Sequence, residues 1–188
     1  MPLEISFELS DADLEHFWKV MVTSRENASD LDEETIIENA RQLLFEVWHT
    51  DTSDFIRERM SQLETMIGML VDKGWGLEDE DRKRVIQALA YFSEAEDLIP
   101  DDIPGLGFLD DAIMIEMVTQ ELKHEIQAFS DFCVFRASEA GRRGEEVHKL
   151  DRSDWLEERR KQLHSRMRHR RKRSGGGSSK GGSPFSLF

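Results

Sequence analysis

Apolar residues recur along most of the chain at the three- and four-residue spacing of amphipathic helices. In the first such segment Leu14, Phe17 and Met21 share one face, and Ser10 with Asp13 has the spacing of a helix-capping pair. The expected helices cover residues 11–27, 32–49, 55–73, 78–93, 110–140 and 153–173. No pair of alternating segments joined by a hairpin turn occurs in the sequence. The predicted fold class is therefore all-α, an irregular helical bundle of about five core helices with a basic C-terminal helix and a disordered tail.

The segment 94–108 interrupts this pattern. Pro100, Pro104, Gly105 and Gly107 lie close together in it, and helices rarely cross such a stretch. The apolar residues in and next to it are Leu98, Ile99, Ile103, Leu106, Phe108 and Leu109. Because they are so frequent, we expect a largely buried loop. Its backbone N–H groups then need partners, and short carboxylates at turns and helix starts supply them.

Residues 97–112 carry a dense motif, which reads Asp-Leu-Ile-Pro-Asp-Asp-Ile-Pro-Gly-Leu-Gly-Phe-Leu-Asp-Asp-Ala. It resembles the pattern D-x-I-P-D-x-I-P-x-x-G-x-x-D-D-A of the YkvA-like family, a bacterial domain of unknown function. The resemblance covers residues 86–117, implies a helix–loop–helix and names no reaction. The motif-loop residues are Asp97, Pro100, Asp101, Pro104, Gly107, Asp110 and Asp111.

Two metal hypotheses stand beside the structural interpretation of these aspartates. Asp97, Asp101, Asp110 and Asp111 could converge on a divalent cation, which prefers oxygen ligands. Glu-x-x-His pairs build di-iron sites in four-helix bundles, and three occur here: Glu46/His49, Glu121/His124 and Glu145/His148. A third interpretation makes the loop a surface for docking a partner.

Charge is divided unevenly along the chain. The net charge is −14, but residues 1–150 hold 14 basic and 35 acidic residues, while residues 151–188 hold 11 basic and 4 acidic ones. We therefore divide the chain into an acidic helical domain over 1–150, a basic arm over 151–173 and a tail over 174–188.

The basic arm has three interpretations. It could bind nucleic acid through phosphate contacts, balance the acidic body as a solvated helix end, or meet an anionic membrane. The membrane interpretation has little support, because apolar residues are sparse after Leu163. The candidate phosphate-binding residues are Arg159, Arg160, Lys161, Arg166, Arg168, Arg170, Arg171, Lys172 and Arg173.

The tail is rich in Gly and Ser up to Ser183, a composition typical of flexible coils. Beyond it Phe185, Leu187 and Phe188 look like the anchors of a docking peptide. The sequence Phe-Ser-Leu-Phe is similar to bacterial sliding-clamp-binding peptides, which makes a sliding clamp a candidate protein partner. The alternative is that the tail packs on its own body.

Other features narrow the class of protein. Cys133 is the only cysteine and lies among phenylalanines, so we expect a buried, unreactive thiol and a reduced, cytoplasmic setting. We also expect Trp18 and Trp48 in the core. No nucleotide-binding or hydrolase motif occurs. The sequence thus favours a non-enzymatic adaptor without a cofactor, with a divalent-metal-binding protein or metal-dependent enzyme as the alternative.

Overall fold

The computed structural model is all-α over the part of the chain that it describes, which is residues 8–93, 98–101, 103, 106–144, 147 and 154–176. The helices are α1 (Asp11–Asn27), α2 (Glu33–His49), α3 (Asp54–Val71), α4 (Asp79–Leu89), α5 (Leu109–Glu121), α6 (Lys123–Arg143) and α7 (Asp154–Gly176). Two short 3₁₀ helices cover Ala28–Asp30 and Ala90–Ser93. Among these residues there is no strand, so the predicted fold class is confirmed.

The first helices begin where the sequence predicts them, because polar side chains cap their free N–H groups. Ser10 and Asp13 form a reciprocal capping box at the start of α1. The side chain of Asp32 accepts a hydrogen bond from the Thr35 N–H at the start of α2, and Ser53 does the same for Ile56 in α3. These caps explain why the beginnings of α1 to α3 are readable from the sequence.

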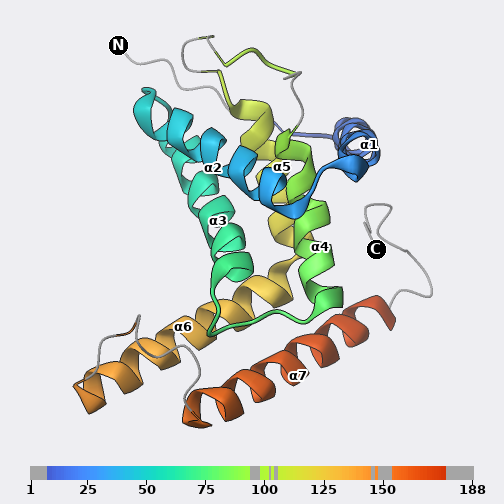
Figure 1. Ribbon diagram of the computed structural model, residues 1–188. Coiled ribbons are helices and arrows are strands. Elements are labelled where there is room, and N and C mark those ends of the chain that lie inside the picture. The colour runs from blue at the N-terminus through green and yellow to red at the C-terminus, as the bar shows by residue number, and fades with distance from the viewer. Residues whose placement is uncertain are drawn as a thin grey trace.

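The helices form two groups (Figure 1). α2, α3, α4 and α5 form the main bundle, and α1 lies at its side. α6 and α7 lie side by side along the lower end of the bundle and pack closely against each other. One apolar core joins both groups, with Met60 and Leu63 of α3, Ile115 of α5, Phe132 of α6 and Leu163 of α7 among its buried members.

The prediction of one long helix over 110–140 is wrong. The structure has two helices there, α5 and α6, which are separated at Leu122. The backbone of Leu122 has φ −93° and ψ 15°, outside helical values. The Leu122 N–H still bonds to the Val118 carbonyl, and the Leu122 carbonyl accepts from the Ile126 N–H. The break leaves these backbone hydrogen bonds in place and involves no proline or glycine. The apolar pattern of the sequence therefore continues across Leu122 and does not indicate that a helix ends there.

The tryptophans also depart from expectation. Trp75, in the connection between α3 and α4, is fully buried against the rings of Phe129, Phe132 and His164. Trp48, expected in the core, is 45% exposed near the end of α2. Trp18 is only partly buried. The periodic stripe on α2 buries Ile36, Ile37, Ala40, Leu44 and Val47 and leaves Trp48 on another face.

None of the described helices combines the length and the apolar character needed to cross a membrane.

Candidate interaction surfaces

The motif loop is held by a buried carboxylate. Asp110, in the first turn of α5, has a fully buried side chain. Its Oδ2 accepts hydrogen bonds from the backbone N–H groups of Leu98, at 2.8 Å, and Ile99, at 3.1 Å. Asp110 thus fixes the incoming side of the loop to the helix that follows it, which is the structural role expected for the aspartates of the motif.

Two neighbouring residues close the loop. A Cβ atom on Gly107 would lie far inside contact distance of the Asp101 carbonyl oxygen, so only glycine fits there. Phe108 is buried, and its backbone has φ 64°, a left-handed conformation that residues other than glycine rarely adopt. The Gly107 N–H donates to the Ile103 carbonyl at 2.8 Å. This geometry leads the chain from the turn into α5.

The expectation of a largely buried loop is wrong for part of it. Phe108 is buried, but Leu98 is 43% exposed, Ile103 37% and Leu106 53%. Ile99 and Leu109 are partly buried, so three of the six apolar residues named for this segment are exposed. Of the remaining motif residues, Pro100 is exposed, Asp101 partly buried and Asp111 buried, while Asp97 and Pro104 lie outside the described residues.

The metal hypotheses gain no geometric support. Within the described part of the chain, no group of three or more His, Cys, Asp and Glu residues is arranged to hold a metal ion. Glu46 accepts from Gln42, and His49 bonds to the Phe45 carbonyl, so that pair has separate partners. The Nε2 of His124 lies 2.9 Å from the Ser174 hydroxyl. Glu145, His148 and Asp97 lie outside the described residues.

The junction of α4, α6 and α7, which we call the α7 junction, buries a second set of charges. Asp81 of α4 is 1% exposed and Glu125 of α6 is fully buried. Nη1 of Arg171 in α7 lies 2.6 Å from Asp81 Oδ1 and 2.8 Å from Glu125 Oε1. Nε of Arg84 lies 3.5 Å from the same glutamate oxygen. Two arginines therefore neutralise two buried carboxylates from different helices.

Other cations of the basic arm also meet the acidic body. Arg168 forms an ion pair with Glu78, and Arg166 forms one with Asp131. Arg160 pairs with Glu157 and donates to the Gly76 carbonyl at 3.1 Å. The guanidinium of Arg159 lies over the ring of Phe135 of the body. The Glu157 that pairs with Arg160 belongs to the arm itself, and Lys161 lies 3.5 Å from it. Arg166 and Arg168 thus place part of the arm's positive charge against acidic residues of the body.

The last turns of α7 keep an exposed cationic surface. Arg170, Lys172 and Arg173 are exposed and form no ion pair with any described residue. Of the nine candidate phosphate-binding residues, these three are exposed without an ion pair to a described residue, and Lys161 is 71% exposed beside Glu157. Phe185, Leu187 and Phe188 lie outside the described residues, so their predicted docking role stays a prediction.

His164 is buried in the α6–α7 interface. It is 2% exposed, and its ring centroid lies 4.2 Å from that of Trp75. Burial lowers the pKa of His164 below its usual value, and the neighbouring guanidinium of Arg160 lowers it further. The imidazole is therefore neutral in the folded protein near pH 7.

Burial and neighbouring side chains also shift the pKa values of Asp72 and Cys133. Burial alone would raise the pKa of Asp72, but hydrogen bonds from Arg136 and from the Trp75 N–H outweigh it, and the pKa of this carboxyl lies below its ordinary value. Burial raises the pKa of the Cys133 thiol. Cys133 is only partly buried, but the raised pKa keeps the thiol protonated and unreactive near neutral pH.

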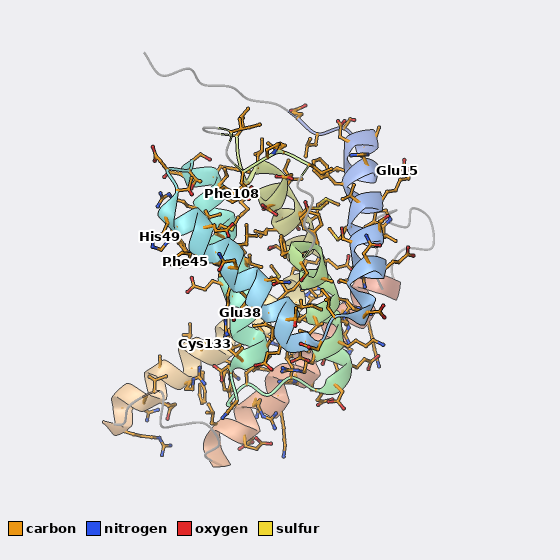
Figure 2. All side chains as sticks on the ribbon, turned by 45° about the horizontal axis from the view of Figure 1, so that its top comes forward. Glu15, Glu38, Phe45, His49, Phe108 and Cys133 are labelled. Carbon is orange, nitrogen blue, oxygen red and sulfur yellow. The ribbon has the colours of Figure 1, made fainter. Side chains whose placement is uncertain are left out.

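The surface around the end of α2, which we call the α2 corner, exposes aromatic side chains that the sequence pattern does not predict to be exposed. Phe45 is 58% and Trp48 45% exposed. The ring of His49 lies 4.0 Å from that of Phe45, and the guanidinium of Arg57 in α3 lies 5.8 Å from that of Trp48. Figure 2 shows Phe45 and His49 at the outer edge of the molecule, on the side away from α1. The sequence feature that could have indicated this surface is the position of Phe45 and Trp48 outside the buried apolar stripe of α2.

Comparison with known proteins gives one finding. A family described as "Protein of unknown function (DUF1232)" matches residues 83–117, which is less than half of the chain. The matched segment begins in α4, includes the motif loop and ends in α5. No curated protein and no solved structure matches the chain. The comparison thus points to the same region as the motif and leaves its chemistry open.

Proposed function

We propose that the protein is a non-enzymatic interaction protein that presents apolar side chains to a protein partner. The observation that carries this proposal is the α2 corner, where Phe45 and Trp48 are exposed beside the stacked Arg57. Trp and Arg are among the residues most often found at the energetic centres of protein interfaces, and Phe is enriched in interfaces over the rest of the surface. In this proposal the loop of the YkvA-like motif is a structural element, and the protein acts in the cytoplasm.

The buried carboxylates Asp81, Asp110 and Glu125 support a role without catalysis. One oxygen of the Asp110 carboxylate, Oδ2, accepts from two backbone N–H groups, and the other, Oδ1, is buried. Asp81 and Glu125 are occupied by arginine. A catalytic carboxylate needs an accessible oxygen within reach of a substrate, and these three lie at or below 1% exposure.

Quantitative affinity purification tests the proposal. The full-length protein is used as bait beside the double variant Phe45→Ser/Trp48→Ser, with Val134→Ser as the matched control, since Val134 is 70% exposed on α6. We expect partners that the wild type and the control retain and the corner variant loses. Identical sets of partners for all three proteins would contradict the proposal.

The tail is a second candidate docking element. Its similarity to clamp-binding peptides names a sliding clamp as a receptor to test. Calorimetry measures the binding of a peptide spanning residues 178–188 to a clamp. The control is the same peptide with Leu187→Ala and Phe188→Ala. Binding of the first peptide alone supports the clamp, and equal signals or none remove it.

Nucleic-acid binding is a second candidate function, favoured by the exposed Arg170, Lys172 and Arg173 at the end of α7. Each phosphate contact contributes about −0.9 to the slope of log K against log salt for duplex DNA. We therefore expect the triple alanine variant to reduce that slope by about 3 in fluorescence anisotropy titrations. If the wild type shows no binding at low salt, the cations of α7 serve the fold alone.

A further inference from the structure

The exposed apolar surface of the α2 corner suits a short peptide. A fully buried aromatic side chain removes about 150–250 Å² from water, so Phe45 at 58% and Trp48 at 45% exposure present roughly 150–250 Å² together. Standard interfaces between folded proteins bury about 800 Å² on each side. The corner is too small to join two folded bodies by itself, but it matches two or three apolar side chains of an extended segment.

The chain contains such a segment. Residues 177–188 follow α7 and lie outside the described residues. They include Phe185, Leu187 and Phe188, which follow a run of Gly and Ser. Phe185 is nine residues beyond Gly176, and a Gly-rich connection of that length has a root-mean-square span of about 15–18 Å. The apolar side chains can therefore be presented well beyond the helix to which they are joined.

Charge complements the apolar match. The residues next to the corner in the chain include the exposed carboxylates Glu46, Asp51 and Asp54, whereas the more distant Glu38 and Glu58 are paired with Arg41 and Arg59. The segment itself contains Lys180 and no acidic residue, and the exposed cations Arg170, Lys172 and Arg173 precede it. An acidic rim would attract this cationic connection and hold it near the aromatic side chains.

The geometry favours docking between two molecules. Figures 1 and 2 place the α2 corner and the end of α7 on opposite sides of the body. A tail of this length would have to cross the whole bundle to reach the corner of its own molecule. A second copy can bring its corner to the tail without that constraint.

We infer that Phe185, Leu187 and Phe188 of one copy dock on Phe45 and Trp48 of a second copy. This inference rests on the proposed function, because it names the partner of the same surface. The contact is heterologous, since the surfaces on the two copies differ, so it joins molecules head to tail into pairs and longer chains.

A peptide titration tests the contact directly. A fluorescein-labelled peptide spanning residues 178–188 is titrated with the full-length protein and followed by anisotropy. We expect saturable binding, unchanged for Val134→Ser and weakened at least about tenfold for Phe45→Ser/Trp48→Ser. A peptide of the same composition in scrambled order is the specificity control. No saturable binding, equal binding of the scrambled peptide, or no effect of the corner variant overturns the inference.

Self-association tests the same contact in the intact chain. Sedimentation velocity of the wild type should show concentration-dependent association. The tail variant Phe185→Ser/Leu187→Ser/Phe188→Ser and the corner variant should each be monomeric, and an equimolar mixture of the two should form pairs through the one remaining tail and the one remaining corner. A wild type that stays monomeric well above the Kd of the peptide overturns the inference. So does a mixture that stays monomeric, because it shows that the two surfaces do not meet.

The failure of this inference is distinguishable from that of the proposed function. If the peptide does not bind, but affinity purification still recovers partners that depend on Phe45 and Trp48, the proposed function stands and the tail is not the partner. Binding of the peptide to a sliding clamp and not to this protein also shows that the tail is not the partner of the corner, and the affinity purification then decides the proposed function by itself. If neither the peptide nor any partner depends on the corner, both fail.

Discussion

The motif loop and the α7 junction both bury carboxylates, and they use them differently. In the loop, Asp110 meets two neutral backbone N–H groups within twelve residues of itself. In the junction, Asp81 and Glu125 meet the guanidinium of Arg171, which is 90 residues from Asp81 in the chain. The first arrangement fixes local backbone geometry, and the second ties distant helices together. A defect in the loop is therefore expected to stay local, while a defect in the junction affects the packing of three helices.

The largest expected effect comes from breaking the junction. Arg171→Met leaves Asp81 and Glu125 buried with only part of their positive partners, because Arg84 and Arg168 remain nearby. Removing one partner of a buried ion pair costs about 3–5 kcal/mol. Because two arginines remain, we expect a loss at the lower end of this range, about 3 kcal/mol. Chemical denaturation measures it. The neighbouring Arg170→Met is the matched control and should leave the free energy of unfolding unchanged; an equal loss in both variants would refute the buried network.

The next effect concerns the backbone of the loop. Gly107→Ala places a Cβ against the Asp101 carbonyl, which belongs to the backbone and cannot rotate away. Overpacking of this kind costs about 1–3 kcal/mol. Gly141→Ala is the control, since a Cβ there meets nothing within 4 Å. We expect a lower melting temperature for Gly107→Ala alone, and equal melting temperatures would contradict the described turn.

A smaller loss should follow from removing the carboxylate of the loop. Asp110→Ala leaves the N–H groups of Leu98 and Ile99 without their acceptor, which costs about 1.5–2 kcal/mol. Asp110→Asn keeps an acceptor oxygen and should lose less. Hydrogen exchange of these two amides sharpens the comparison, because it should speed up in Asp110→Ala and stay unchanged in Arg171→Met under conditions where that variant is folded. Fast exchange in the wild type would contradict the hydrogen bonds.

The smallest effect is the pH dependence that His164 brings to the α7 junction. Its pKa is lowered in the folded protein by burial and by Arg160, while Arg168 of α7 also disfavours the imidazolium and Asp81 of α4 favours it. The negative charge of Glu78, the residue just before α4, also acts on the imidazole. Below the ordinary histidine pKa, about 6.5, the unfolded chain binds a proton that the folded chain does not. Stability therefore falls as pH decreases from about 6.5 toward the lowered pKa.

The variant His164→Gln tests this assignment. It should flatten the stability profile in the mildly acidic range while leaving the decline at lower pH, where carboxylates such as Asp72 and Glu78, with their lowered pKa values, become protonated. An unchanged profile in the variant would show that His164 does not control this range. The loop carries no histidine, so the Gly107 variant should keep the pH dependence of the wild type.

The sequence predicts what depends on local chemistry. The capping residues Ser10, Asp32 and Ser53 predict the starts of three helices to within one turn of their observed positions. Asp110 accepts backbone hydrogen bonds from the loop, as expected for a carboxylate beside a Pro/Gly-rich segment. The break at Leu122 was not predictable, because it preserves the apolar stripe and most of the hydrogen bonds.

The surfaces depend on tertiary packing, which the sequence pattern does not contain. Arg171 looks like any cation of a polar helix until α4 brings Asp81 against it. Trp48 looks like a core residue until the bundle leaves its face of α2 uncovered. In both cases the residue type is readable and its neighbour is not, because the neighbour comes from a distant part of the chain.

The bend at Leu122 also bears on how the chain assembles. It turns α6 out of the line of α5, so that α6 meets α7, and only ten residues separate the ends of these two helices. Closing a short loop costs little chain entropy compared with bringing residues 90 positions apart together, as the Arg171–Asp81 pair requires. We therefore expect the α6–α7 hairpin to form early in folding and the burial of Asp81 to follow when the hairpin docks on α4.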